Sequence, residues 1–187
     1  MKIYKKLSSI ALLTVSLFAI SNTLSTPFDP ALREKLKKVK KLIFKIAGLR
    51  NFKEYQKLVN LKINHLISQR EAAGSPTTPK EATALFTSAI ISNNTKLAKK
   101  LISLKADVNK KFKSPENPHI KITPLSLLII SSVIFEFDPT AFIELLMQNG
   151  ANPSIKEKFN GVEIDAIKLA KHLRLHKAIR IFKRYGY

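Results

Sequence analysis

The chain has 187 residues, enough for one domain or one domain with an appendage, and its hydrophobic content of 45% is ordinary for a packed core. It contains no cysteine, which excludes disulfides, thiolate nucleophiles and cysteine-based zinc sites. The 33 basic residues against 13 acidic ones give a formal net charge of +20, which favours nucleic acid, acidic membranes or acidic proteins as partners.

Lysine supplies most of this charge, whereas bidentate recognition of phosphate or base edges favours arginine. The abundance of lysine, isoleucine and asparagine is also typical of an AT-rich genome. We therefore favour a general positive surface over a dedicated polyanion site.

Residues 1–21 have the pattern of a secretory signal peptide. Lys2, Lys5 and Lys6 precede an uncharged, mostly apolar run from Leu7 to Ile20, and small residues follow at the cleavage position. The run is shorter than the ~20 residues that a bilayer span needs. We predict export to the periplasm or the medium, with an uncleaved membrane anchor as the alternative.

Residues 22–71 predict a basic helical hairpin. Asp29-Pro30 begins the first helix and Asn51, followed by Glu54, begins the second. Apolar residues recur every three or four positions in both helices, and lysines occupy much of the rest. The expected apolar stripes are Leu32, Leu36, Val39, Ile43 and Ile46, and then Phe52, Tyr55, Val59, Ile63 and Leu66.

Three roles are open for this hairpin. It can seal the N-terminal end of the domain that follows, lie on an anionic membrane surface, or act as a separate interaction element. We favour the N-terminal cap. Residues 72–79, rich in proline, glycine, serine and threonine, are the predicted linker, and residues 80–187 the second domain.

Helix start and stop signals alternate through this second domain. Thr78 forms a capping box with Glu81 and competes with Thr83 for the first helix start, so that helix is expected to be one turn longer than usual. Thr123-Pro124 is an N-cap followed by a first-turn proline, and Asp165 is a third N-cap. Asn149-Gly150 is a stop, since glycine takes the left-handed conformation at low cost.

These segments resemble the ankyrin repeat, a β-turn followed by two helices every ~33 residues. The stretch Thr123-Pro124-Leu125 matches the start of that repeat, and Gly150-Ala151-Asn152 matches its end. The end recurs upstream as Lys105-Ala106-Asp107-Val108-Asn109, with lysine in the place of glycine. The resemblance covers residues 78–185 as two clear repeats and one degenerate one, and implies an all-α ankyrin-repeat solenoid preceded by the helical hairpin.

Insertions lengthen these units. Residues 110–122 are expected to form an extended finger loop, and residues 153–161 a second finger. Residues 131–138 are interpreted as an inserted loop, and Asp138-Pro139 as the start of the next helix. Phe135 and Phe137 in this loop are either buried against a neighbouring helix, which we favour, or exposed for a partner.

We find no catalytic, cofactor-binding or metal-binding constellation in the sequence. The five glycines are scattered, so a phosphate loop is not evident. His172 and His176 have helical i, i+4 spacing, but the glutamate of a metalloprotease motif and a third ligand are missing. We therefore interpret His172 and His176 as part of a solvated helix face. The chain is predicted not to be an enzyme.

The resemblance implies protein binding through the fingers and the concave face, with an acidic protein partner and a monomeric chain. The finger residues expected to bind the partner are Lys110, Lys111, Phe112, Lys113, His119, Lys121, Lys156, Lys158 and Phe159. Solvated loop lysines without a partner are the alternative.

A rival function is binding of nucleic acid, lipopolysaccharide or anionic lipid by the basic helices between Arg33 and Lys62. A structural exported protein without a specific ligand is a third reading. Export, the repeats and the composition together suggest a bacterial envelope protein or effector.

Overall fold

The computed structural model describes residues 41, 50–113, 121–159 and 162–187. The predicted signal peptide, nearly all of the first hairpin helix and the tip of the first finger, including His119, lie outside these residues. The described chain is mostly helical, and none of its helices combines the length and the apolarity that a membrane crossing takes. Its seven helices are α3 (Phe52–Ala72), α4 (Pro79–Ile91), α5 (Thr95–Ser103), α6 (Pro124–Phe135), α7 (Thr140–Gln148), α8 (Ala166–His172) and α9 (His176–Arg184).

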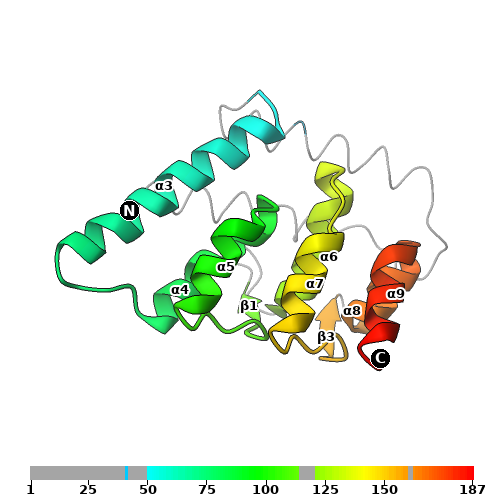
Figure 1. Ribbon diagram of the computed structural model, residues 1–187. Coiled ribbons are helices and arrows are strands. Elements are labelled where there is room, and N and C mark those ends of the chain that lie inside the picture. The colour runs from blue at the N-terminus through cyan, green and yellow to red at the C-terminus, as the bar shows by residue number, and fades with distance from the viewer. Residues whose placement is uncertain (1–40, 42–49, 114–120, 160–161) are drawn as a thin grey trace.

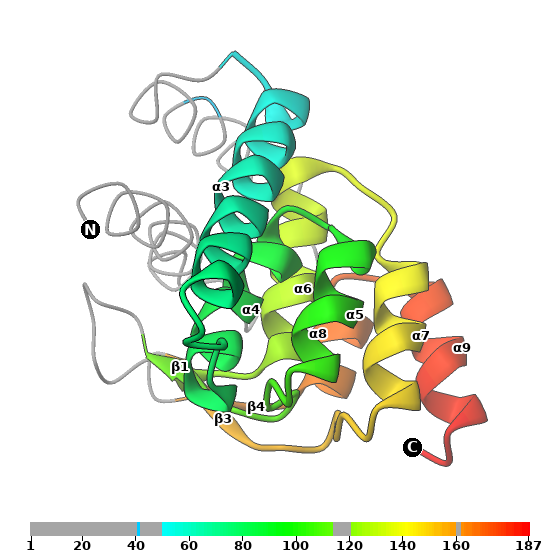
Figure 2. The same cartoon turned by 60° about the vertical axis from the view of Figure 1, so that its left-hand side comes forward.

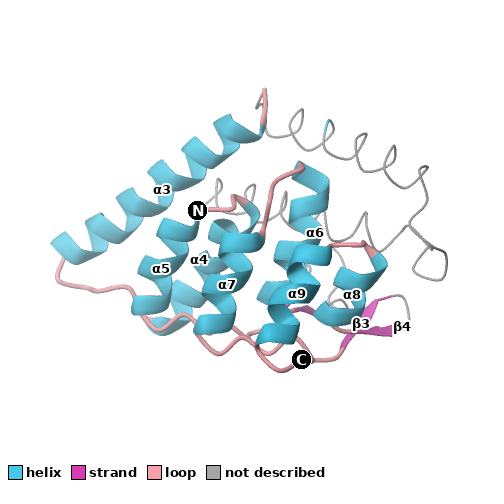
Figure 3. Cartoon of the chain, turned by 45° about the vertical axis from the view of Figure 1, so that its right-hand side comes forward, coloured by secondary structure: helices cyan, strands magenta, loops and turns pink. Residues whose placement is uncertain are grey.

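Helices α4 to α9 form three pairs, in each of which the second helix folds back on the first (Figure 1). The pairs lie side by side in two layers. Helices α4, α6 and α8 contact one another in sequence in one layer, and α5, α7 and α9 do so in the other (Figure 3). Every pair therefore buries one flank against its neighbour, and the core is continuous from α4 to α9.

Helix α3 packs along α4 at the N-terminal end of this row (Figure 2). Its buried residues are Tyr55, Val59, Ile63 and Ile67, which share one helical face. The predicted stripe was right for Tyr55, Val59 and Ile63, whereas Phe52 and Leu66 at its two ends are only half-buried and Ile67 is buried instead of Leu66.

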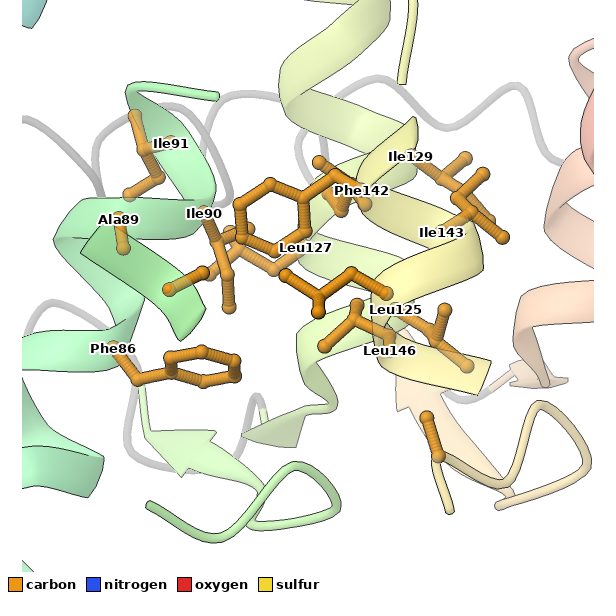
Figure 4. Packing of buried hydrophobic residues seen from close by; sticks show 14 of the residues in the cluster. Phe86, Ala89, Ile90, Ile91, Leu125, Leu127, Ile129, Phe142, Ile143 and Leu146 are labelled. Carbon is orange, nitrogen blue, oxygen red and sulfur yellow. The ribbon is translucent and has the colours of Figure 1, made fainter. Parts of the chain in front are cut away.

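The core between the first two pairs is filled by large side chains that point toward one another (Figure 4). The rings of Phe86 on α4 and Phe142 on α7 lie 6.4 Å apart, and both side chains are fully buried. A second aromatic group joins α3 to the end of α6, where Phe52 stacks on Phe135 at 4.7 Å and on Phe137 at 5.5 Å. This contact bears out the expected burial of Phe135, while Phe137 is half-buried.

Local capping sets where most helices begin. Thr78 and Glu81 form the predicted capping box, so α4 starts one turn before Thr83. Thr123 and Asp165 cap α6 and α8 as expected. The start predicted at Asp138-Pro139 is wrong by one residue, because α7 begins at Thr140 and Asp138 accepts a hydrogen bond from the Thr140 amide at 2.9 Å.

One other expectation needs correction. Residues 131–135 are not loop but the last turn of α6, in which only Val133 is not fully buried. Each of the two predicted fingers contains an antiparallel hairpin. Strand β1 (Phe112–Lys113) pairs with β2 (Lys121–Ile122), and β3 (Glu157–Phe159) pairs with β4 (Val162–Ile164). Apolar Phe112 stands opposite Ile122, a cross-strand pair that favours the ladder.

Every described helix stops at a residue with positive φ, and the following amide bonds back to a carbonyl five residues earlier. Lys105 has φ 65° where the second pair has Gly150 at φ 80°. After Lys105, the Ala106 amide donates to the Leu101 carbonyl at 3.0 Å. Lys105 therefore adopts the left-handed backbone conformation, as its alignment with Gly150 in the sequence predicts.

We expect Lys105→Gly to raise the free energy of unfolding by about 1 kcal/mol, because an L side chain in the left-handed conformation is strained and glycine is not. Gly150→Ala is the matched control, and it should lose a similar amount. A Cβ at Gly150 meets nothing within 4 Å, so the loss there measures backbone strain alone. Chemical denaturation of the two variants tests this, and equal stability of both with the parent would contradict it.

Candidate functional site

The two β-hairpins lie next to each other at one end of the helix pairs, with β2 beside β3 (Figure 2). Asn109 holds their bases together. Its side-chain Nδ2 donates to the Gly150 carbonyl at 2.9 Å, and its Oδ1 accepts from the Asn152 amide at 2.8 Å. Lys111 adds a third link by donating its Nζ to the Lys156 carbonyl at 2.5 Å. The hairpins therefore form one continuous surface, which we call the finger surface.

A buried carboxylate lies beneath the finger surface. The side chain of Glu157 in β3 points inward, is only 2% exposed, and accepts a hydrogen bond from the Thr123 amide through Oε1 at 2.7 Å. Its other oxygen, Oε2, and the hydroxyl of Ser126 one turn into α6 are buried and make no hydrogen bond of ordinary length and angle. Burial raises the pKa of Glu157 to about 7, against the lowering influence of the Thr123 hydrogen bonds, of the nearby Ser126 hydroxyl and of Lys111.

A neighbouring ion pair fixes the base of the second hairpin. Lys156 Nζ lies 2.7 Å from Asp165 Oδ2, and Asp165 Oδ1 accepts from the Lys168 amide at 2.8 Å as the cap of α8. Burial by itself would raise the pKa of Asp165, but the hydrogen bonds from Lys156 and Lys168 outweigh it and lower that pKa. Since Lys156 already has an anionic partner, its cation is less available to another molecule.

The predicted partner-binding residues divide by their surroundings. Lys110, Lys121 and Lys158 are exposed on the finger surface, and none of them belongs to an ion pair among the described residues. Glu163 stands opposite Lys158 in the hairpin register and offsets part of its charge. Lys111 and Phe112 are half-buried. Lys113 and Phe159 belong to β1 and β3, and His119 lies outside the described residues.

The layer of α4, α6 and α8 has less exposed surface for a partner than the resemblance to ankyrin repeats implies. No residue of α6 is exposed, and only Val133 is half-buried. The exposed cations of this layer are at its margins, Lys80 on α4 and Lys168 and Lys171 on α8. The fingers, rather than the middle of this layer, therefore provide the accessible charged surface.

Sequence reasoning missed Glu157 and Asn109. The alternation of Lys156, Glu157 and Lys158 was a usable signal, because a strand sends alternate side chains to opposite faces and exposed lysines imply an inward glutamate. No comparable signal marked Asn109, whose two hydrogen bonds reach a segment more than 40 residues away. Among the described residues, no group of three or more histidines and carboxylates could hold a metal ion, and His172 and His176 are not part of such a group.

No protein-family model, curated protein or solved structure matches this chain.

Proposed function

We propose that the chain is a non-catalytic binding protein built as an ankyrin-type stack of helix pairs, and that its finger surface binds an acidic protein segment. The arrangement of helix pairs with hairpins at one end of the stack supports the ankyrin reading. The single observation that carries the binding proposal is the presence of three exposed cations on the two fingers that Asn109 holds together, namely Lys110 just before β1, Lys121 in β2 and Lys158 in β3. A surface of fixed shape loses less conformational entropy on binding than separate mobile loops do.

Replacing these three cations tests the proposal. In affinity capture, the variant Lys110→Gln, Lys121→Gln, Lys158→Gln should hold its acidic partner at least ~10-fold more weakly than the parent. The control carries the same charge change at Lys80, Lys99 and Lys171, which are exposed and outside both hairpins. Equal binding by the finger variant and the parent would refute the proposal that the finger surface binds the partner.

The rival function is polyanion binding through the basic N-terminal helices. It is favoured by one observation, namely that Arg50, Lys53 and Lys57 are exposed near the start of α3 and make no ion pair with a described residue. The dependence of binding affinity on salt concentration distinguishes the two functions. Binding that neutralises several phosphates weakens steeply as ionic strength rises, whereas a protein complex with a few anchors depends on it less.

A further inference from the structure

A polar groove of about 760 Å³ lies between the first half of α3 and the turn that joins α4 to α5. Residues 50–60 form one wall and residues 92–96 the other. Two hydrogen bonds join the walls. Gln56 Nε2 donates to the Ser92 carbonyl at 2.7 Å, and Asn94 Nδ2 donates to Asn60 Oδ1 at 3.1 Å. Figure 3 shows α3 running beside the α4–α5 pair. The groove is a product of tertiary packing, because its two walls come from segments more than 30 residues apart in the chain.

The groove gathers uncompensated positive charge. Arg50, Lys53 and Lys57 come from the α3 wall and Lys96 from the other, and all four side chains are exposed. None of them makes an ion pair within the described part of the chain. The one carboxylate in the lining, Glu54, accepts a hydrogen bond from the Arg50 backbone amide at 2.7 Å through Oε2. Four cations against one anion leave the groove strongly positive.

The same walls carry hydrogen-bond donors that suit phosphate oxygens. Asn51 caps α3 and Asn94 caps α5, so the first turns of both helices border the groove. The backbone amides of Lys53 and Lys96, in those first turns, donate to no acceptor among the described residues. Amides at helix starts favour anions, and here they stand beside four cations.

A second groove, farther along the stack, has a different balance of charge. It is smaller, about 350 Å³, and lies between the turns of the second and third pairs. Its lysine, Lys177, is 2.7 Å from Asp138 Oδ2, and the hydrogen bonds from Lys177 and Thr140 lower the pKa of Asp138 to about 2. Asp138 thus compensates Lys177 in the second groove, which also contains the exposed Arg174, whereas none of the four cations of the first groove has an ion-pair partner among the described residues.

We propose that the groove between α3 and the α4–α5 turn is a binding site for a compact ligand with two or more phosphate groups. Cations on both walls can contact separate phosphates at once, and the volume exceeds that of a single phosphate. Arg50 supplies the planar fork that binds phosphate oxygens in pairs, and the three lysines add mobile point charges. The site is separate from the finger surface and does not depend on the function proposed for it, but it shares Arg50, Lys53 and Lys57 with the rival polyanion-binding function and rests on that function.

Calorimetric titration of the chain with inorganic tripolyphosphate tests the proposal. We expect saturable binding at about 150 mM salt, and at least ~10-fold weaker binding by the variant Lys53→Gln, Lys57→Gln, Lys96→Gln. The control variant Lys80→Gln, Lys99→Gln, Lys171→Gln has the same net charge and should bind like the parent. Amide shifts in an NMR spectrum should change at residues 50–60 and 92–96.

A second titration identifies the source of the phosphates. Phosphatidylcholine vesicles with a minor fraction of a bisphosphorylated inositol lipid should bind through the same three lysines if the natural ligand is a lipid headgroup. Binding of tripolyphosphate without vesicle binding assigns a soluble ligand. Equal losses in the groove and control variants, or no saturable binding by the parent, would overturn the site. The outcome of the protein-capture experiment with the finger variant does not affect the phosphate titration. The finger surface and the phosphate site can therefore be refuted independently of each other.

Discussion

The Glu157→Gln variant is expected to be more stable than the parent by about 3 kcal/mol at about pH 8, and equal to it below about pH 4. Glu157 is buried with one oxygen that makes no hydrogen bond of ordinary length and angle, and its pKa rises from 4.5 to about 7 in the folded chain. Between these values the folded state holds a proton that the unfolded state has released. The parent therefore loses stability as the pH rises from about 4.5 to about 7, and it stays at the lower value above that range.

Glutamine removes this dependence because it has the shape of the protonated acid and carries no charge. Its oxygen can still accept from the Thr123 amide, and its amide group gives Ser126 a potential donor. Urea denaturation at several pH values measures the effect. The control is Glu163→Gln, which removes an exposed carboxylate from the partner strand of the same hairpin and should leave the pH dependence of the parent unchanged. Parallel pH curves for Glu157→Gln and the parent would contradict the burial of a charged Glu157.

Leu101→Asp is expected to unfold the chain. Leu101 on α5 is 0% exposed and belongs to the continuous core, so the change removes buried apolar area and places an unpaired carboxylate among apolar side chains. The combined cost exceeds ~5 kcal/mol, comparable to the whole stability of an ordinary domain. Leu145→Asp on α7 should act in the same way, since Leu145 is 7% exposed.

Circular dichroism and a thermal melt check this result. The matched control is Leu61→Asp on α3, because that leucine is 63% exposed and should change stability by less than ~0.5 kcal/mol. A Leu101→Asp variant that melted with the parent would show that the core does not run through α5.

Helix limits were the most predictable part of the fold, because they depend on contacts between near neighbours in the chain. The capping box of Thr78 and Glu81 and the N-caps at Thr123 and Asp165 involve groups three residues apart. The one start that failed is at Asp138-Pro139. There Asp138 Oδ1 accepts from the amide and the hydroxyl of Thr140, two residues on, and α7 begins at Thr140 without a side-chain cap.

The candidate sites were less predictable than the helices. Exposed lysines in the fingers follow from hydrophilic loop composition, and the structure places Lys110, Lys121 and Lys158 at the surface as expected. The pairing of Lys156 with Asp165, however, removes one of the predicted cations from the accessible set. The groove beside α3 could not be foreseen, since its two walls are more than 30 residues apart and meet only through the bonds of Gln56 and Asn94.

The sequence by itself determined the paired helices, the N-caps at Thr78, Thr123 and Asp165, the left-handed stops at Lys105 and Gly150, and the net positive charge, since each depends on composition or on residues within one or two turns. Tertiary structure alone decided three further properties: which face of α3 is buried, the inward burial of Glu157, and the meeting of cations from α3 and α5. The physical reason is that burial and electrostatic environment depend on every group within a few ångströms, and in this fold those groups come from segments far apart in the chain.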